Sequence, residues 1–114
     1  MTLEQTQNSM LLEMQSVAQD SIQHTLDGQN YDDSKIENWS NNIISGILKK
    51  MKETKTPQFK FIAHCMVLSS RSQFVNDVQM AIWDSKEDLK ITTKWANETM
   101  QCIVSLWAFR TRYD

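Results

Sequence analysis

Hydrophobic residues in the first quarter of the chain recur at intervals of three and four, which is the period of an α-helix. Gly28 follows the last of them and is expected to end this helix, because glycine readily adopts the left-handed backbone conformation. Thr2 and Gln5 have the spacing of a capping box at its start. The apolar face of the predicted helix consists of Leu11, Met14, Ala18, Ile22 and Leu26.

A second helical pattern begins near Ser34 and ends before Pro57. Ser34 and Glu37 fit a capping box, in which the serine side chain accepts from the Glu37 amide and the glutamate reaches back. The lysines at the end of the pattern and then Pro57 are expected to close the helix. Ile36, Trp39, Ile43 and Ile47 form the apolar face, widened by Ile44, Leu48 and Met51, and Asn38, Asn42 and Ser45 face water.

After Pro57 the pattern changes to runs of β-branched and aromatic residues, which are typical of strands. Four strands are predicted, over residues 59–68, 74–83, 89–96 and 99–109, the third alternating strictly between apolar and polar residues. Such alternation is expected of a strand with one wet face. Two helices followed by four strands predict an α+β fold, with the helices packed on a four-stranded antiparallel sheet. We expect one domain over residues 1–114, with the first helix in 1–30, the second in 31–56 and the sheet in 57–110.

The first and last predicted strands are apolar on both faces. Two helices can cover only one face of a sheet, and each large apolar side chain left in water forgoes about 1.5–3 kcal/mol. A second copy of the chain is the simplest cover for the other face, so the pattern predicts a dimer. Residues 69–73 contain no tight-hairpin pair. The second strand therefore either crosses to a neighbouring copy or follows a loose local loop.

Composition and charge narrow the class of protein. The chain has 114 residues, 40% of them hydrophobic, and a formal net charge of −2. This slight acidity disfavours a nucleic-acid surface, and the lysine cluster at residues 49–55 suits a solvated helix end. No apolar run approaches the roughly 18 residues of a membrane span, and the N-terminus lacks a signal-peptide pattern. We therefore expect a cytosolic protein in which Cys65 and Cys102 are reduced, metal-free core thiols.

Candidate catalytic and ligand-binding sets fail on geometry or spacing. His64 and Cys65 are adjacent on a predicted strand, so they point to opposite faces and cannot form a nucleophile–base pair. The acidic residues at positions 84–88 lack the ligand spacing of a calcium loop. Gly28 and Gly46 are the two glycines of the chain, and they cannot build a phosphate-binding loop. The sequence favours a binding protein that is not an enzyme and needs no cofactor.

Several residues from position 31 to position 109 resemble the Tctex-type dynein light chains. In the second helix they are Tyr31, Ser34, Lys35, Ile36 and Trp39, and in the first strand Phe59, Lys60, Phe61, Ile62 and Cys65. The remainder are Trp83, Asp84, Trp95, Asn97, Thr99, Met100, Cys102, Ile103, Val104 and Ser105. Two features depart from the family pattern: residues 69–73 lack its usual glycines, and residues 110–114 extend past its usual end.

The resemblance implies a dimer that exchanges the second strand and serves as a dynein accessory subunit. The implied partners are a dynein intermediate chain and a second light chain, identical or related, with indirect association to the heavy chain and microtubules. Neither nucleic acid nor membrane is an expected partner, and the implied location is the cytoplasm and cytoskeleton, with an axoneme left open. The partner peptide is expected at Val75, Asn76, Asp77, Val78, Gln79, Met80, Ala81 and Ile82. The dimer interface is expected at Met66, Leu68, Ile82, Trp83 and Trp107.

Two other functions compete with a dynein light chain. A motor-independent adaptor would use the same peptide-binding groove for receptors or signalling proteins. An enzyme would need a catalytic set that the sequence does not offer. Co-purification with the motor subunits distinguishes a dynein light chain from a motor-independent adaptor.

Overall fold

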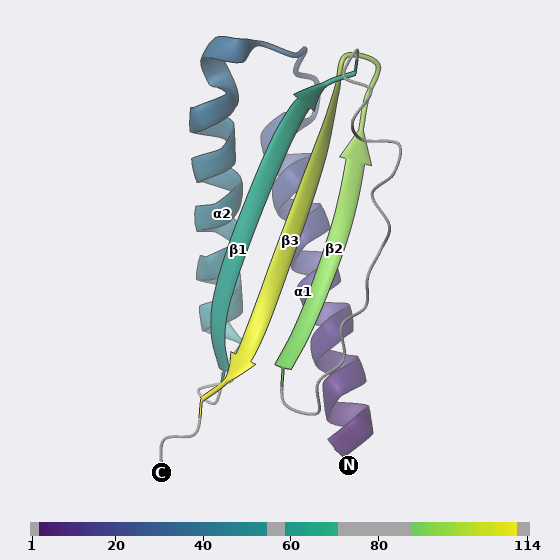
Figure 1. Ribbon diagram of the computed structural model, residues 1–114, viewed down its shortest axis with the longest axis vertical. Coiled ribbons are helices and arrows are strands. Elements are labelled where there is room, and N and C mark those ends of the chain that lie inside the picture. Colours follow the sequence, from purple (N-terminus) through teal and green to yellow (C-terminus); the bar gives the residue numbers. More distant parts are fainter. Residues whose placement is uncertain (1–2, 55–58, 71–87, 112–114) are drawn as a thin grey trace.

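A computed structural model describes residues 3–54, 59–70 and 88–111. Along the chain the elements are α1 (Leu3–Leu26), a 3-10 turn η1 (Asp33–Lys35), α2 (Ile36–Glu53), β1 (Phe59–Ser69), β2 (Asp88–Ala96) and β3 (Met100–Arg110). The strands form an antiparallel sheet in the order β1-β3-β2, and both helices lie on one face of it (Figure 1). The predicted α+β class, with two helices on an antiparallel sheet, is confirmed. The strand predicted at residues 74–83 lies outside the described residues.

The buried stripe of α1 repeats every four residues. It consists of Met10, Met14, Ala18, Ile22 and Leu26. Met10 takes the place that the sequence pattern gave to Leu11, which is only half-buried. Gly28 has a φ of +74°, and the Gln29 N–H donates to the Leu26 carbonyl at 3.0 Å. This left-handed residue ends the helix as predicted, whereas Thr2, in the predicted capping box, lies outside the described residues.

The start of α2 differs from the predicted capping box. The Asp32 carboxylate accepts from the backbone N–H of Ser34 at 2.9 Å and from its hydroxyl at 2.6 Å. Ser34 therefore donates its hydroxyl proton instead of accepting from Glu37. Lys35, at the N-cap of α2, makes no capping hydrogen bond with its side chain. The carboxylate two residues upstream is a charged acceptor, which makes the stronger bond.

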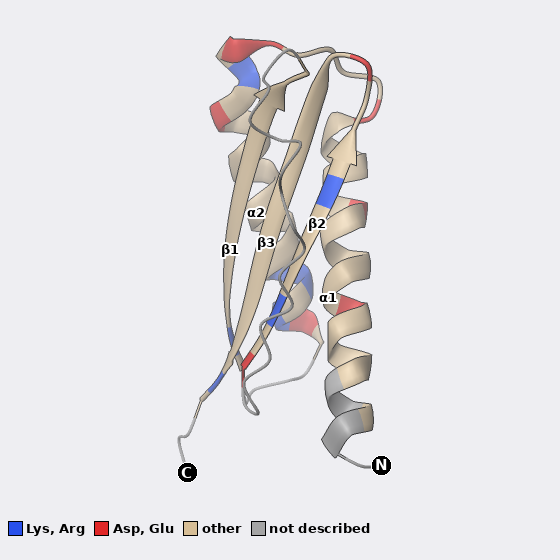
Figure 2. Ribbon diagram, turned by 45° about the vertical axis from the view of Figure 1, so that its right-hand side comes forward, with Lys and Arg blue, Asp and Glu red and all other residues tan. Residues whose placement is uncertain are grey.

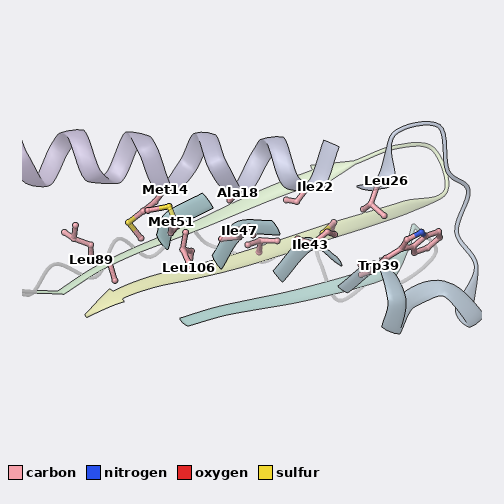
Figure 3. Packing of buried hydrophobic residues seen from close by; sticks show 14 of the residues in the cluster. Met14, Ala18, Ile22, Leu26, Trp39, Ile43, Ile47, Met51, Leu89 and Leu106 are labelled. Carbon is pink, nitrogen blue, oxygen red and sulfur yellow. The ribbon is translucent and has the colours of Figure 1, made fainter. Parts of the chain in front are cut away.

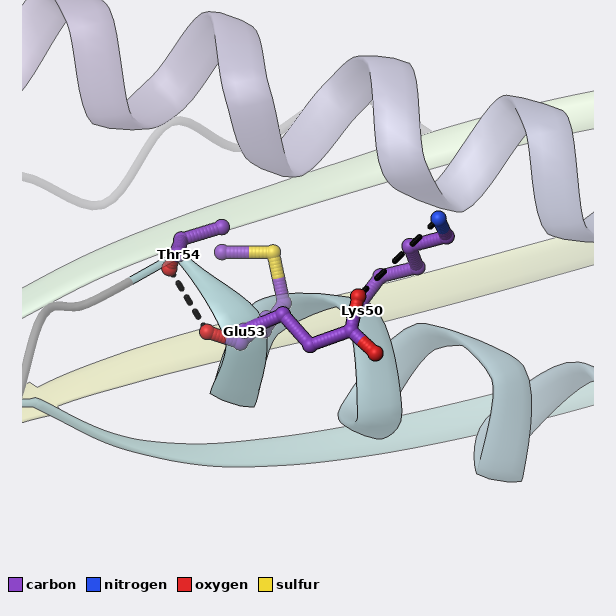
Figure 4. Close-up of polar contacts among 4 residues, drawn as sticks. Lys50, Glu53 and Thr54 are labelled. Atoms are coloured by element: carbon purple, nitrogen blue, oxygen red, sulfur yellow. Dashed lines mark hydrogen bonds and ion pairs between the residues drawn. The ribbon is translucent and has the colours of Figure 1, made fainter.

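The predicted core face of α2 is confirmed, with Trp39, Ile43, Ile47 and Met51 buried. The Met51 carbonyl at the helix end accepts from the Thr54 hydroxyl at 2.6 Å and from the Thr54 backbone N–H at 3.2 Å (Figure 4). In the same last turn the Lys50 amino group lies 4.0 Å from the Glu53 carboxylate, and both side chains are more than half exposed. A pair this exposed contributes little to stability.

The hydrophobic core lies between the two helices and the inner face of the sheet (Figure 3). Figure 1 shows α2 behind β1, and α1 behind β3 and β2. On the inner face the largest buried side chains of the strands are Leu89, Met100, Val104 and Leu106. The predicted alternation of β2 is confirmed, because Leu89 and Thr93 are buried while Lys94 is exposed.

The turn from β2 to β3 is held by one side chain. Asn97 Oδ1 accepts from the backbone N–H groups of Thr99 and Met100, both at 2.9 Å. Its amide nitrogen donates to the Gln29 carbonyl at 2.9 Å, and the Tyr31 N–H donates to the Thr99 hydroxyl at 2.9 Å. The hairpin is therefore tied to the segment that joins α1 to α2.

Candidate interaction face

The face of the sheet turned away from the helices is called the outer face here. In β1 it carries Lys60, Ile62, His64, Met66 and Leu68; in β3 Gln101, Ile103, Ser105, Trp107 and Phe109; and in β2 Asp88, Lys90, Thr92, Lys94 and Ala96. Their alternation with the buried residues of each strand follows from the two-residue period of the sheet. The register aligns these side chains in rows, such as Ile62–Trp107–Lys90 and Met66–Ile103–Lys94.

The β1 and β3 side of the outer face carries its larger apolar side chains, with exposed Lys60 and His64 interspersed among them on β1. Ile62 is 48% exposed and Met66 is 42% exposed. In the described part of the chain, the only other exposed large hydrophobic residue is Leu12 on α1. Leu68 and Trp107 are half-buried on the same face. Neighbouring exposed apolar residues such as these are typical of a surface that another protein covers.

The β2 side of the outer face is polar, with Lys90 and Lys94 along the strand and Asp88 at its start. Figure 2 shows the basic residues of β2, which are Lys90 and Lys94. The Lys90 amino group lies 5.0 Å from the centre of the Trp107 ring, an attractive cation–π arrangement. Between the two rows that contain lysines, the Thr92 and Ser105 hydroxyls lie 3.3 Å apart. The larger apolar side chains of the outer face therefore lie on β1 and β3, and its β2 side is polar.

One polar atom on the outer face lacks a partner. The side-chain oxygen of Gln101 is buried, and it accepts no hydrogen bond in the described structure. A buried acceptor left unpaired costs about 1–3 kcal/mol. A donor from another chain would remove that cost.

The sheet offers two lateral edges as well as its outer face. Both β1 and β2 pair with the central strand β3, and neither has a second strand partner among residues 59–70 and 88–111. Edge backbone groups are a template for a further strand.

The structure places three of the residues predicted for the dimer interface on this outer face, namely Met66, Leu68 and Trp107. Ile82 and Trp83, and the predicted peptide-binding residues at 75–82, lie outside the described residues. Ile62 was not among the predicted interface residues, although it is the most exposed apolar residue of the sheet. The available signal was that Ile62 precedes Met66 by four residues, which places both on one face of a strand. The contact of Lys90 with Trp107 depends on the strand register, which the sequence does not provide.

The residues tested for catalysis are separated as expected. His64 is exposed on the outer face, whereas Cys65 points to the helix side and contacts the core. His24 is exposed on α1. No group of three or more His, Cys, Asp or Glu residues is placed to hold a metal ion in the described part of the chain. Within that part, no helix combines the length and apolar character that crossing a membrane requires.

A shallow groove of about 660 Å³ runs between α1 and α2. It is lined by Glu13, Ser16, Val17, Asp20, Ser21, His24, Gly46 and Lys50. Its charged residues are of both signs and exposed to solvent. The exposed apolar side chains of the sheet, Ile62 and Met66, lie on its outer face. That face is therefore the stronger candidate for binding a protein.

The fold is that of a small α+β protein whose sheet exposes apolar side chains on its outer face. Comparison with known proteins identifies its family: residues 11–109 match the model of the Tctex-1 family. The chain belongs to that family, and the resemblance predicted from its residues is confirmed.

Relatives named as dynein light chains support this assignment. The chain is 24% identical over 107 residues to "Dynein light chain Tctex-type" of Dictyostelium discoideum, covering 94% of this chain and 96% of that protein. The Drosophila melanogaster protein of the same name is 26% identical over 77% of this chain and 78% of its own length. "Dynein light chain Tctex-type 3" of Mus musculus is 27% identical over 84% of this chain and 82% of its own.

Proposed function

We propose that this protein is a non-catalytic light chain of a dynein microtubule motor, which binds a peptide segment of the dynein intermediate chain. Membership of the Tctex-1 family is the observation that carries the proposal. The names of the relatives support the motor, and their matches extend over most of their own lengths. The exposed apolar outer face supports a binding role.

The light chain acts as a dimer, formed by exchange of the strand at residues 74–83. Four features of the outer face support it: exposed Ile62 and Met66, half-buried Trp107, and the unpaired oxygen of Gln101. A second sheet, laid face to face, would remove the apolar side chains from water and supply a donor to Gln101. The partner copy is an identical chain or a related light chain.

The intermediate-chain peptide binds in extended form beside residues 75–82 and adds itself as a strand. An exchanged strand at a dimer seam presents backbone donors and acceptors, which an incoming segment can pair. Backbone hydrogen bonds give affinity with little sequence preference, and side-chain pockets give selectivity. A dimer has two such peptide-binding sites. A partner that carries two peptides binds more tightly, because its second peptide binds at a high effective concentration.

In the cell this function places the protein in the cytoplasm with the cytoskeleton, linked to the heavy chain and microtubules only through the intermediate chain. Both cytoplasmic and axonemal motors fit. The same peptide-binding site beside residues 75–82 would also serve a motor-independent adaptor for receptors or signalling proteins.

Affinity capture from native cytoskeletal or ciliary extract tests the proposal. The tagged protein should recover dynein intermediate and heavy chains together, in amounts that survive a salt wash. A Met66→Glu variant should recover less of both, whereas Leu12→Glu, which changes an equally apolar exposed residue on α1, should match the wild type. Capture of receptors or signalling proteins without motor subunits would favour the adaptor and contradict the motor assignment.

A further inference from the structure

Two thiols lie close together on the neighbouring strands β1 and β3 of the sheet. Cys65 Sγ of β1 lies 3.7 Å from Cys102 Sγ of β3. In the register of the two strands, Cys65 is opposite Val104 and Cys102 is opposite Val67, so the thiols are diagonal neighbours on the inner face. Diagonal side chains on one face of an antiparallel pair lie within reach of each other. The β1–β3 pairing continues along the strands before and after the two cysteines, and it fixes their relative position.

The two thiols differ in exposure. Cys102 is fully buried, whereas Cys65 is half-buried on β1, the edge strand beside α2. A small reagent can therefore reach Cys65 before Cys102. The immediate neighbour of Cys65 is a second sulfur, within the same chain.

The more exposed thiol, Cys65, is also the more acidic one. The hydrogen bond between the two thiols, helped by the Ser40 hydroxyl, lowers the pKa of Cys65 although burial opposes the shift. The hydrogen bond with Cys65, followed by burial and the charge of the Cys65 thiolate, raises the pKa of Cys102. Cys65 therefore ionises first. Because the thiolate is the nucleophile, Cys65 is the more reactive member of the pair.

We propose that Cys65 and Cys102 form a reversible oxidation site, at which hydrogen peroxide converts the dithiol to an intramolecular disulfide. The Cys65 thiolate attacks one peroxide oxygen, the O–O bond breaks, and the leaving hydroxide takes a proton to become water. Cys65 is then a sulfenic acid. Cys102 attacks the Cys65 sulfur, the S–O bond breaks, and hydroxide leaves with the Cys102 proton as a second water. One peroxide is reduced to two waters while two thiols are oxidised to one disulfide.

The geometry favours a link within one chain over a link between chains. A disulfide requires the sulfurs to approach to about 2.05 Å, and they already lie in contact at 3.7 Å. The buried position of Cys102 keeps it from the cysteines of other chains. The bond would close a loop between residues 37 positions apart, which includes all of β2. Restricting the unfolded chain in this way should raise the melting temperature of the oxidised form by about ten degrees.

Peroxide treatment of the reduced full-length protein, followed by intact mass and peptide mapping, tests the proposal. The wild type should lose two hydrogens, retain no added oxygen and yield a peptide pair linked through Cys65 and Cys102. Dithiothreitol should restore the original mass and melting temperature. In Cys102→Ser the reaction should stop at a sulfenic acid on Cys65, which a cyclic 1,3-diketone traps. In Cys65→Ser the oxidation of Cys102 should be at least tenfold slower than that of Cys65 in the wild type.

Three results would overturn the proposal: disulfides between chains, added oxygen without an internal link, or a link that forms only in denaturant. Mapping the wild type decides among them even if a serine variant fails to fold.

Discussion

Gly46 of α2 lies so close to Ser21 of α1 that a Cβ added at Gly46 would stand 2.8 Å from the Ser21 hydroxyl oxygen. That hydroxyl donates to the Ile43 carbonyl at 2.9 Å, on the neighbouring turn of α2. The close approach of the two helices therefore depends on a missing side chain and a short one.

Gly46→Ala should show strong coupling to Ser21→Ala. In the wild-type background the added methyl group displaces the Ser21 hydroxyl and costs its hydrogen bond, which offsets the roughly 1 kcal/mol by which alanine favours a helix over glycine. With Ser21→Ala in place the methyl group meets no hydroxyl, and the helix preference should appear as added stability. A double-mutant cycle in urea should give a coupling of about 1 kcal/mol. Additive effects would mean that the helices are not in this contact.

Asn97→Ala should destabilise the fold by about 2–3 kcal/mol, because it removes an acceptor for two backbone N–H groups and a donor to Gln29. Chemical unfolding measures this loss. Asn30→Ala is the matched control, because Asn30 is exposed on the segment that joins α1 to α2. It should change stability by less than about 0.5 kcal/mol. Equal effects of the two substitutions would contradict the assigned hydrogen bonds.

Met66→Glu should weaken self-association by tenfold or more, since a carboxylate on the outer face would lose water when the second sheet docks. Analytical ultracentrifugation across micromolar concentrations measures the dissociation constant. Leu12→Glu makes the same chemical change at a residue that is 68% exposed on α1 and should leave association unchanged. A wild type that stays monomeric throughout this range would contradict the face-to-face dimer.

Asp32 should contribute a pH-dependent part of the stability. Hydrogen bonds from the hydroxyl and then the backbone N–H of Ser34 hold the pKa of the Asp32 carboxyl below its ordinary 3.8. A lowered folded-state pKa means that the unfolded chain binds the proton more readily, so the contribution is fully present above pH 3.8. It is lost as the pH falls through the lowered value.

Asp32→Asn should accordingly flatten the acid side of the stability profile, as measured by urea unfolding from pH 5 down to pH 2.5. Ser34→Ala removes the hydroxyl donor and should flatten the profile in the same direction, to a smaller extent. Profiles parallel to that of the wild type would show that Asp32 does not hold this turn together.

Much of the fold could be predicted from the sequence because burial imposes a period. Ile43, Ile47 and Met51 recur at helical spacing, and Leu89, Ile91 and Thr93 alternate as a half-buried strand must. These patterns indicate which face of each element meets the core. They do not indicate which acceptor captures a given donor, so the Ser34–Glu37 box and the Asp32 cap were equally compatible with the residues.

Contacts that depend on register could not be predicted in this way. The helical stripe could pass through Leu11 or Met10, and packing on the sheet selects Met10. Cys65 and Cys102 were recognised separately as core thiols, but their contact follows from the alignment of β1 with β3. The outer face was predicted from the two apolar faces of the first strand, whereas the polar side chains of β2 became part of it only through strand order.

Hydrogen–deuterium exchange with a peptide from the light-chain-binding segment of a dynein intermediate chain is the most direct test of the proposed function. A peptide of the same composition in scrambled order serves as the control. Binding by strand addition should slow amide exchange in residues 75–82 with the native peptide and not with the scrambled one, because the backbone N–H groups of the strand become paired. Slowed exchange confined to α1 or β2, or no change at residues 75–82 at saturating peptide, would contradict the account.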